Sequence, residues 1–293
     1  MFPLHIGIDP VLLQLGPIAL RWYGLMIGIG IAVGLIVNAR EADRTGIGRD
    51  NVYSLATWLI IFGIIGGRLY YVVQNDLGYY LTHPQDILAT WEGGMAFYGT
   101  IFTTVIVILV FAFRRRLPFW RLLDTLALGL PLGQAFGRVG NIVNGDIVGY
   151  PTTSPFAFVY SNPHSFITPS LLNRPVFPAS LVELFTSLLI FALLWILRTR
   201  LRAPGVLAVL YVFAYSLSQF IVFYWRANSI TLFGLKQAQL TAIVMMAVCI
   251  PLAIYLQRRY WSNGMKAPDQ ELPATAVPDS LAAPSEQAHG ASR

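Results

Sequence analysis

Seven apolar stretches, separated by polar connections, occupy most of this 293-residue chain. Each approaches or exceeds the length of about 20 residues that an α-helix needs to cross the hydrocarbon core of a bilayer. With 56% hydrophobic and 12% charged residues, the chain has more apolar surface than one soluble core of this length needs. We therefore predict an all-α, polytopic integral membrane protein with about seven transmembrane helices. The predicted spans are residues 21–37, 52–73, 95–113, 120–136, 179–197, 205–225 and 238–256.

Basic residues predict how these helices are oriented. Four clusters follow the first, third, fifth and seventh stretches, whereas the outward connections are nearly free of basic side chains: 141–177 has only Arg174 and 227–237 only Lys236. Since basic residues concentrate in cytoplasmic loops, the amino terminus is expected outside and the carboxyl terminus in the cytoplasm. The clusters are Arg40, Arg44 and Arg49; Arg114, Arg115, Arg116 and Arg121; Arg198, Arg200 and Arg202; and Arg258, Arg259 and Lys266.

The composition predicts one folded domain and a tail. Residues 1–261 form the membrane domain, and from residue 262 to 293 alanine, proline, serine and acidic residues replace the apolar pattern, which indicates a disordered cytoplasmic tail. The first stretch lacks the basic start of a signal peptide and is followed by arginines, so it should remain as an anchor. The outward connection 141–177, rich in proline and aromatic residues, is either a cap over the membrane face or an ordinary loop.

Several functional classes are disfavoured. The net charge of +6 is dispersed in clusters at the ends of the spans, without a nucleic-acid-binding motif. The four histidines are scattered, so neither a zinc site nor a serine triad is indicated. The only cysteine, Cys249, lies within the seventh stretch and is expected to serve packing, since an apolar setting disfavours its thiolate.

Residues 137–149 read GRVGNIVNGDIVG and directly follow the fourth apolar stretch. Arg138 places a guanidinium near the membrane boundary, where it can hold phosphate oxygens through paired hydrogen bonds. A charge beside hydrocarbon costs about 2.5 to 3.5 kcal/mol on insertion scales, so Arg138 needs a partner such as a lipid phosphate or a carboxylate. If the fourth span ends in a helical turn, Asn141 shares a face with Arg138. The segment indicates a site for a phospholipid headgroup.

This segment resembles the signature of the bacterial prolipoprotein diacylglyceryl transferase family. Four shorter blocks resemble the family in the same order, namely LRWYGLM at 20–26, GGRLYYV at 66–72, WEGGMAFYG at 91–99 and FPASLVELF at 177–185. The resemblance covers about residues 16–256. The signature is specific, whereas the other blocks are individually weak.

The resemblance implies a reaction in the bacterial plasma or inner membrane. Enzymes of this family transfer the diacylglyceryl group of phosphatidylglycerol to the lipobox cysteine thiol of a prolipoprotein, the first step of lipoprotein maturation, and release glycerol 1-phosphate. The implied partners are phosphatidylglycerol, prolipoprotein signal peptides with a lipobox cysteine, and membrane lipids. The resemblance implies no nucleic acid, no metal and no organic cofactor.

The resemblance also implies roles for individual residues. Negative charge gathers on the departing phosphate, so a fixed cation lowers the barrier, and Arg138 is the candidate. Tyr98 is the second catalytic candidate, as a polar or acid–base group, although a phenol with a pKa of about 10 is a poor base at neutral pH. The expected substrate-binding residues are Arg138, Asn141, Asn144, Asp146, Gly149, Tyr23, Arg68, Glu183 and Arg226.

Some of these residues have an alternative role. Asp146 can orient Arg138, and Tyr23 either binds lipid or belongs to an interfacial aromatic belt. Arg68 is either a second phosphate ligand or the partner of Asp124 or Glu183. A carboxylate such as Glu183 within a span must be paired or protonated.

The chain departs from the family pattern around the signature. Tyr98 replaces the usual histidine, and the sixth span lacks the usual arginine and glutamate. Besides a divergent transferase, the sequence therefore allows a noncatalytic lipid-binding paralogue or a small membrane transporter. The other departures are Gln219 for arginine, Phe223 for glutamate, and Phe177, Ser180 and Val182 for histidine, glutamine and tyrosine.

Overall fold

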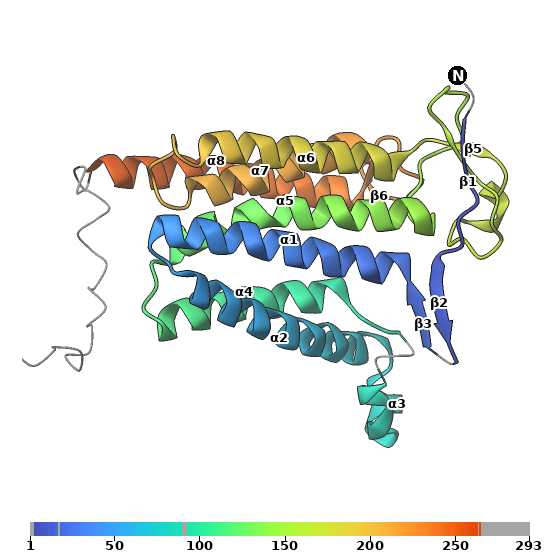
Figure 1. The fold of residues 1–293 in the computed structure, drawn as a ribbon, viewed down its shortest axis with the longest axis horizontal. Coiled ribbons are helices and arrows are strands. Elements are labelled where there is room, and N and C mark those ends of the chain that lie inside the picture. The colour runs from blue at the N-terminus through green and yellow to red at the C-terminus, as the bar shows by residue number, and fades with distance from the viewer. Residues whose placement is uncertain (1–2, 17, 90–92, 263, 265–293) are drawn as a thin grey trace, which may run out of the picture.

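The computed structural model describes residues 3–16, 18–89, 93–262 and 264. Within these ranges, long helices overlie the seven apolar stretches and run side by side (Figure 1). Four of them, α1, α2, α6 and α8, are each long and apolar enough to cross a membrane. The helices are α1 (Trp22–Thr45), α2 (Arg49–Asn75), α4 (Phe97–Arg114), α5 (Phe119–Asn144), α6 (Ala179–Leu197), α7 (Val206–Val222) and α8 (Gln237–Ser262). Of the predicted tail, the described residues include only Ser262 and Gly264.

The packing of α1 along α5 places the site. Gly34 of α1 lies so close to α5 that a Cβ added to it would be 2.9 Å from the carbonyl oxygen of Gly129. Such close approach is typical of small residues at helix interfaces in membranes. Further along, Gly140 of α5 lies against Tyr23, so the start of α1 adjoins the end of α5. On either side of this pair, α2 packs along α4, α6 along α5, and α7 along α8.

Short strands at one end of the helices depart from the all-α prediction. Figure 1 shows β1, β5 and the β2–β3 hairpin together beyond the ends of α1 and α5. In the three-stranded sheet, β1 pairs in parallel with β4, with Leu4 opposite Phe158, and β4 pairs antiparallel with β5. Strands of two to five residues carry too little periodicity to be predicted. They are β1 (Leu4–Ile6), β2 (Val11–Leu15), β3 (Ile18–Arg21), β4 (Phe158–Tyr160), β5 (Pro175–Val176), β6 (Ile230–Leu232) and β7 (Leu235–Lys236).

The connection between α5 and α6 forms a packed unit with the amino-terminal strand. Its core contains Ile6, Phe158, Tyr160, Ile167 and Val176, and Tyr160 is fully buried. The Tyr160 hydroxyl donates a hydrogen bond of 3.0 Å to the carbonyl oxygen of Ile142, which joins this unit to the end of α5. Three shorter helices complete the described fold: α3 (Leu77–Thr82), η1 (Pro84–Leu88) and η3 (Pro169–Leu171).

Two carboxylates, Glu41 and Asp124, connect the helices at the opposite end, which carries the basic clusters. Glu41 of α1 is 3% exposed and forms ion pairs with Arg44 and, at 2.6 Å, with Arg198 after α6. Asp124 of α5 accepts hydrogen bonds from the backbone nitrogens of Gly205, at 2.6 Å, and Ala208, at 2.8 Å. Asp124 thereby satisfies amide groups at the start of α7 that have no partner within the helix.

Candidate functional site

Arg138 lies near the carboxyl end of α5 and forms an ion pair with α6. Its Nη2 is 2.6 Å from Oε2 of Glu183. The other carboxylate oxygen, Oε1, accepts a hydrogen bond of 3.2 Å from Nη1 of Arg226, which follows α7. Of the two partners expected for Arg138, the structure shows a carboxylate. Since one carboxylate is shared by two guanidinium groups, the trio keeps a net positive charge.

The two arginine side chains are more exposed than the glutamate that they share. The Glu183 side chain is 1% exposed, whereas those of Arg138 and Arg226 are 17% and 13% exposed. A buried carboxylate attracts cations more strongly than it would in water, because the surrounding dielectric constant is low. Glu183 therefore holds both guanidinium groups from the protein side, and both keep surface that an anion can reach.

Two further signature residues extend this cluster, Asn141 on α5 and Asp146 just after the helix. Arg138 Nη1 donates a hydrogen bond of 3.1 Å to Oδ1 of Asn141, which is 4% exposed. The Asn141 amide in turn donates to both carboxylate oxygens of Asp146, at 3.1 and 3.0 Å. The helix continues through Asn144 and ends where Gly145 adopts a φ of 78°. Arg138 and Asn141 thus share a helix face, and Asp146 acts on Arg138 through Asn141.

Asn144 and Tyr23 border the same cluster. The Asn144 side-chain oxygen is buried and has no hydrogen-bond partner among the described residues, while its backbone carbonyl accepts a 2.8 Å bond from Phe166. Such an oxygen can accept a hydrogen bond from a hydroxyl group. The Tyr23 side chain is 38% exposed and close enough to Asp146 and Arg138 to interact with both charges. Both residues remain candidates for contact with a headgroup.

Gly149 joins the signature segment to the end of α7. It forms an isolated antiparallel bridge with Arg226, and its amide donates a 2.9 Å hydrogen bond to the Phe177 carbonyl. The next amide, of Tyr150, donates to the Trp225 carbonyl at 2.9 Å. A Cβ added to Gly149 would be 2.7 Å from the Phe177 Cβ and closer still to the Trp225 carbonyl oxygen. Only glycine fits at this position without movement of the backbone.

Replacing Gly149 with alanine is expected to lower the free energy of unfolding by about 1 to 3 kcal/mol, because the added methyl group overpacks the junction that carries Arg226. Thermal unfolding in detergent measures the effect. Gly28→Ala in α1 is the matched control, since its Cβ would meet nothing within 4 Å. Equal melting temperatures for the two variants would contradict this packing argument.

Arg68 serves a different purpose from the pairings expected for it. Its Nε donates to the Ile87 carbonyl at 2.8 Å and its Nη2 to the Asp86 carbonyl at 2.5 Å. Its Nη1 donates to the carbonyls of Gly93 and Gly94, at 2.7 and 2.9 Å. The alternative in which Arg68 pairs with Asp124 or Glu183 is wrong: Asp124 binds backbone amides of α7, and Glu183 binds two other arginines. With four N–H groups engaged, Arg68 fixes the connection between α2 and α4 and has little capacity left for phosphate.

Tyr98, near the start of α4, connects this helix to α8. Its side chain is 44% exposed, and its hydroxyl accepts a hydrogen bond of 2.9 Å from the amide of Gln237, the first residue of α8. This places a phenol at an accessible position between α4 and α8. Its catalytic role stays a prediction.

Two buried polar residues near the cluster were not predicted. Lys236 is 5% exposed and Gln239 is 2% exposed. Lys236 donates hydrogen bonds to the carbonyls of Phe223 and Arg226, both at 2.5 Å. The Phe223 ring, at the position of the missing glutamate, lies 4.4 Å from the Arg226 guanidinium carbon. The signal that was available in the sequence was the isolation of Lys236, the only basic residue between 227 and 237.

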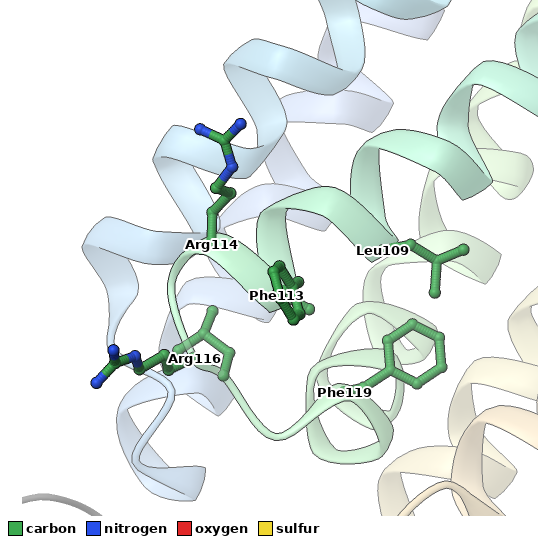
Figure 2. Close-up of a pocket in the computed structure, with 7 residues that line it drawn as sticks. Leu109, Phe113, Arg114, Arg116 and Phe119 are labelled. Carbon is green, nitrogen blue, oxygen red and sulfur yellow. The ribbon is translucent and has the colours of Figure 1, made fainter.

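The cavity shown in Figure 2 lies far from this cluster. It has a volume of about 700 Å³ and is lined by Leu109, Ala112, Phe113, Arg114, Arg116, Leu117 and Phe119 at the connection between α4 and α5. From Phe119 to Arg138, α5 rises by roughly 28 Å at about 1.5 Å per residue. The cavity is thus separate from the Arg138 cluster. Within the described residues, no group of three or more histidine, cysteine, aspartate or glutamate side chains could hold a metal ion.

Comparison with known proteins places these features in one family. Residues 10–255 match the family model for prolipoprotein diacylglyceryl transferase. The chain is 34% identical over 264 residues to the phosphatidylglycerol–prolipoprotein diacylglyceryl transferase of Thermosynechococcus vestitus, covering 89% of this chain and 96% of that protein. It is 36% identical over 247 residues to the protein of the same name from Synechococcus elongatus, covering 81% and 84% of the two chains. The match to the Bordetella parapertussis protein of that name is 34% over 259 residues, covering 86% and 96%. The chain belongs to the prolipoprotein diacylglyceryl transferase family.

Proposed function

We propose that this chain transfers the diacylglyceryl group of phosphatidylglycerol to the cysteine thiol of a prolipoprotein. The sulfur attacks the glycerol carbon that bears the phosphodiester and forms a carbon–sulfur bond. The carbon–oxygen bond breaks, its electron pair stays with the phosphate oxygen, and glycerol 1-phosphate leaves. The thiol proton goes to solvent or to a base. The products are a thioether-linked diacylglyceryl cysteine and glycerol 1-phosphate.

The cluster around Glu183 supports this assignment most directly. Negative charge on the phosphate rises as the carbon–oxygen bond breaks, so cations already in place there stabilise the transition state more than the bound lipid. Arg138 and Arg226 provide two such cations, and the buried Glu183 orients them before the lipid arrives. Arg138 is proposed to contact the departing phosphate, with Arg226 as its second cation.

Asn144 and Asp146 suit the hydroxyl groups of the headgroup. Phosphatidylglycerol carries two free hydroxyls beyond its phosphate, and these need acceptors. The unpartnered Asn144 oxygen and the Asp146 carboxylate, next to Arg138 through Asn141, are suitable acceptors. Tyr23 at the rim is proposed to contact the glycerol backbone or the ester groups.

The cysteine thiol needs little activation by the protein. A cysteine with a pKa of about 8.5 exists as a few per cent thiolate at neutral pH. We propose that Tyr98, with its hydroxyl hydrogen-bonded to Gln237, helps to position the incoming thiol rather than acting as a strong base.

We propose that the site lies on the outer side of a bacterial plasma or inner membrane, the orientation that the basic clusters favour. There the lipid reaches Arg138 from the bilayer, and the lipobox cysteine of a translocated signal peptide approaches from the same leaflet. The packed unit around β1, β4 and β5 lies over this end of α5 and is proposed to limit access of water to the reacting atoms.

The test of this function is formation of the thioether. Purified protein is mixed with labelled phosphatidylglycerol and a lipobox peptide, and we expect labelled diacylglyceryl peptide together with glycerol 1-phosphate. A matched peptide with serine in place of the cysteine is the control and should remain unlabelled. Lipid binding without product would instead favour a noncatalytic lipid-binding paralogue, and absence of both would favour a transporter.

A further inference from the structure

Lys236 is a buried cation held by backbone carbonyls. It ends β7, directly before α8, and is 5% exposed. Its Nζ donates hydrogen bonds of 2.5 Å to the carbonyl oxygens of both Phe223 and Arg226. No carboxylate of the described residues forms an ion pair with it. Burying an ammonium group is costly unless its charge is compensated, so this placement requires a specific benefit.

The position of the two carbonyls explains how the ammonium is accommodated. α7 ends at Val222, and the carbonyls of Phe223 and Arg226 follow its last turn. The carboxyl end of a helix carries partial negative charge and favours a cation. The ring of Tyr150 lies 4.8 Å from Nζ and offers a cation–π contact. Neighbouring Gln239 accepts a 3.0 Å hydrogen bond from the Lys236 amide and fixes the backbone there.

These contacts join the two segments that carry the phosphate site. Arg226, whose carbonyl receives Lys236, is also the arginine that donates to Glu183 at 3.2 Å. Tyr150, whose ring faces Lys236, directly follows Gly149, which is bridged to Arg226. Lys236 thus contacts the end of α7 and the end of the signature segment at the place where they meet.

We infer that Lys236 is a positioning residue for the reaction, an inference that rests on the proposed function. It fixes the backbone of Arg226, and through Arg226 the orientation of Glu183 and Arg138. It also adds a third cation to the region of Arg138 and Arg226, since its Nζ lies 2.5 Å from the Arg226 carbonyl oxygen. The excess of positive charge favours a bound phosphodiester, which carries one negative charge. Lys236 therefore acts on recognition of the lipid and not on the peptide.

The test compares Lys236→Met with Lys236→Arg, using dioleoyl phosphatidylglycerol in detergent micelles and a fluorescent lipobox peptide. For Lys236→Met we expect kcat/KM for the lipid to fall about tenfold, with KM for the peptide unchanged, after normalisation to folded enzyme by size-exclusion chromatography. Lys236→Arg keeps a cation that donates to carbonyls. Its kcat/KM for the lipid, on a logarithmic scale, should lie closer to that of wild type than to that of Lys236→Met. Arg174→Met, which removes an exposed cation of the connection between α5 and α6, is the charge-matched control and should behave as wild type.

A merely structural role predicts a different pattern. It would lower the yield of folded protein while leaving the lipid kinetics per folded molecule normal, or it would lower kcat/KM equally for the lipid and the peptide. Either result would overturn the inference. So would a Lys236→Arg variant no better than Lys236→Met. If Lys236→Met does not fold, Lys236→Gln, which keeps a donor but removes the charge, is measured in the same way.

The experiment also separates this inference from the proposed function. A wild-type enzyme that forms no thioether contradicts the function, whereas an active wild type with an unaffected Lys236→Met variant contradicts only the positioning role. If the wild type is inactive, the positioning role of Lys236 is tested by measuring lipid binding. Lys236→Met must then weaken affinity for phosphatidylglycerol, but not for phosphatidylcholine, or the inference fails.

Discussion

Replacing Arg138 with alanine is expected to lower kcat for diacylglyceryl transfer by about a hundredfold to a thousandfold, the usual effect of removing one group that stabilises developing negative charge. Arg138 is the partly exposed member of a pair whose carboxylate is almost fully buried. It can therefore reach the departing phosphate, where the charge increases during the reaction. The rate of thioether formation at saturating phosphatidylglycerol measures the effect.

The fold should tolerate this substitution. Without Arg138, Glu183 keeps its hydrogen bond from Arg226, so the carboxylate is not left without a cation. We expect normal membrane insertion and a melting temperature within a few degrees of wild type. Arg174→Ala, which removes an exposed arginine of the connection between α5 and α6, serves as the control and should keep full activity. Normal transfer by Arg138→Ala would refute its assignment to the phosphate.

Hydropathy located the long helices, and its largest errors are at the ends of α1 and α5. α1 continues to Thr45 rather than residue 37, because Glu41 in its polar last turns is buried between Arg44 and Arg198. α5 continues to Asn144 rather than residue 136, because Gly145 adopts the left-handed conformation that closes a helix. Ion pairs between distant segments are invisible to a local hydropathy average. The same extension of α5 places Asn141 one turn from Arg138.

The site was predicted as a set of residues but not as a network. Charge beside hydrocarbon showed that Arg138 and Glu183 each needed a partner, yet it could not say that they partner each other across α5 and α6. The helix order along the chain says little about which helices pack together, so one alternative for Arg68 was pairing with carboxylates that in fact bind other groups. Lys236 was missed because its partners are backbone carbonyls, which leave no trace in the sequence.

The second large effect is expected from Glu183→Gln. This change removes the only carboxylate between two guanidinium groups and keeps the shape of the side chain. Breaking a buried ion pair by neutralising one partner typically costs about 3 to 5 kcal/mol, because the remaining charges are left uncompensated. We expect the melting temperature in neutral detergent to fall sharply, and transfer at low lipid concentration to fall with it because Arg138 and Arg226 lose their common orientation.

A charge-matched double variant separates repulsion from lost packing. Glu183→Gln combined with Arg226→Gln restores the net charge of the trio, so part of the stability should return even though two native contacts are gone.

Anionic lipid should also restore stability. Phosphatidylglycerol should raise the melting temperature of Glu183→Gln more than that of wild type, and phosphatidylcholine should not. A bound phosphodiester would then be replacing the missing carboxylate, as expected if both anions share the same two cations. Equal shifts with both lipids, or no recovery in the double variant, would mean that Glu183 contributes packing and not charge.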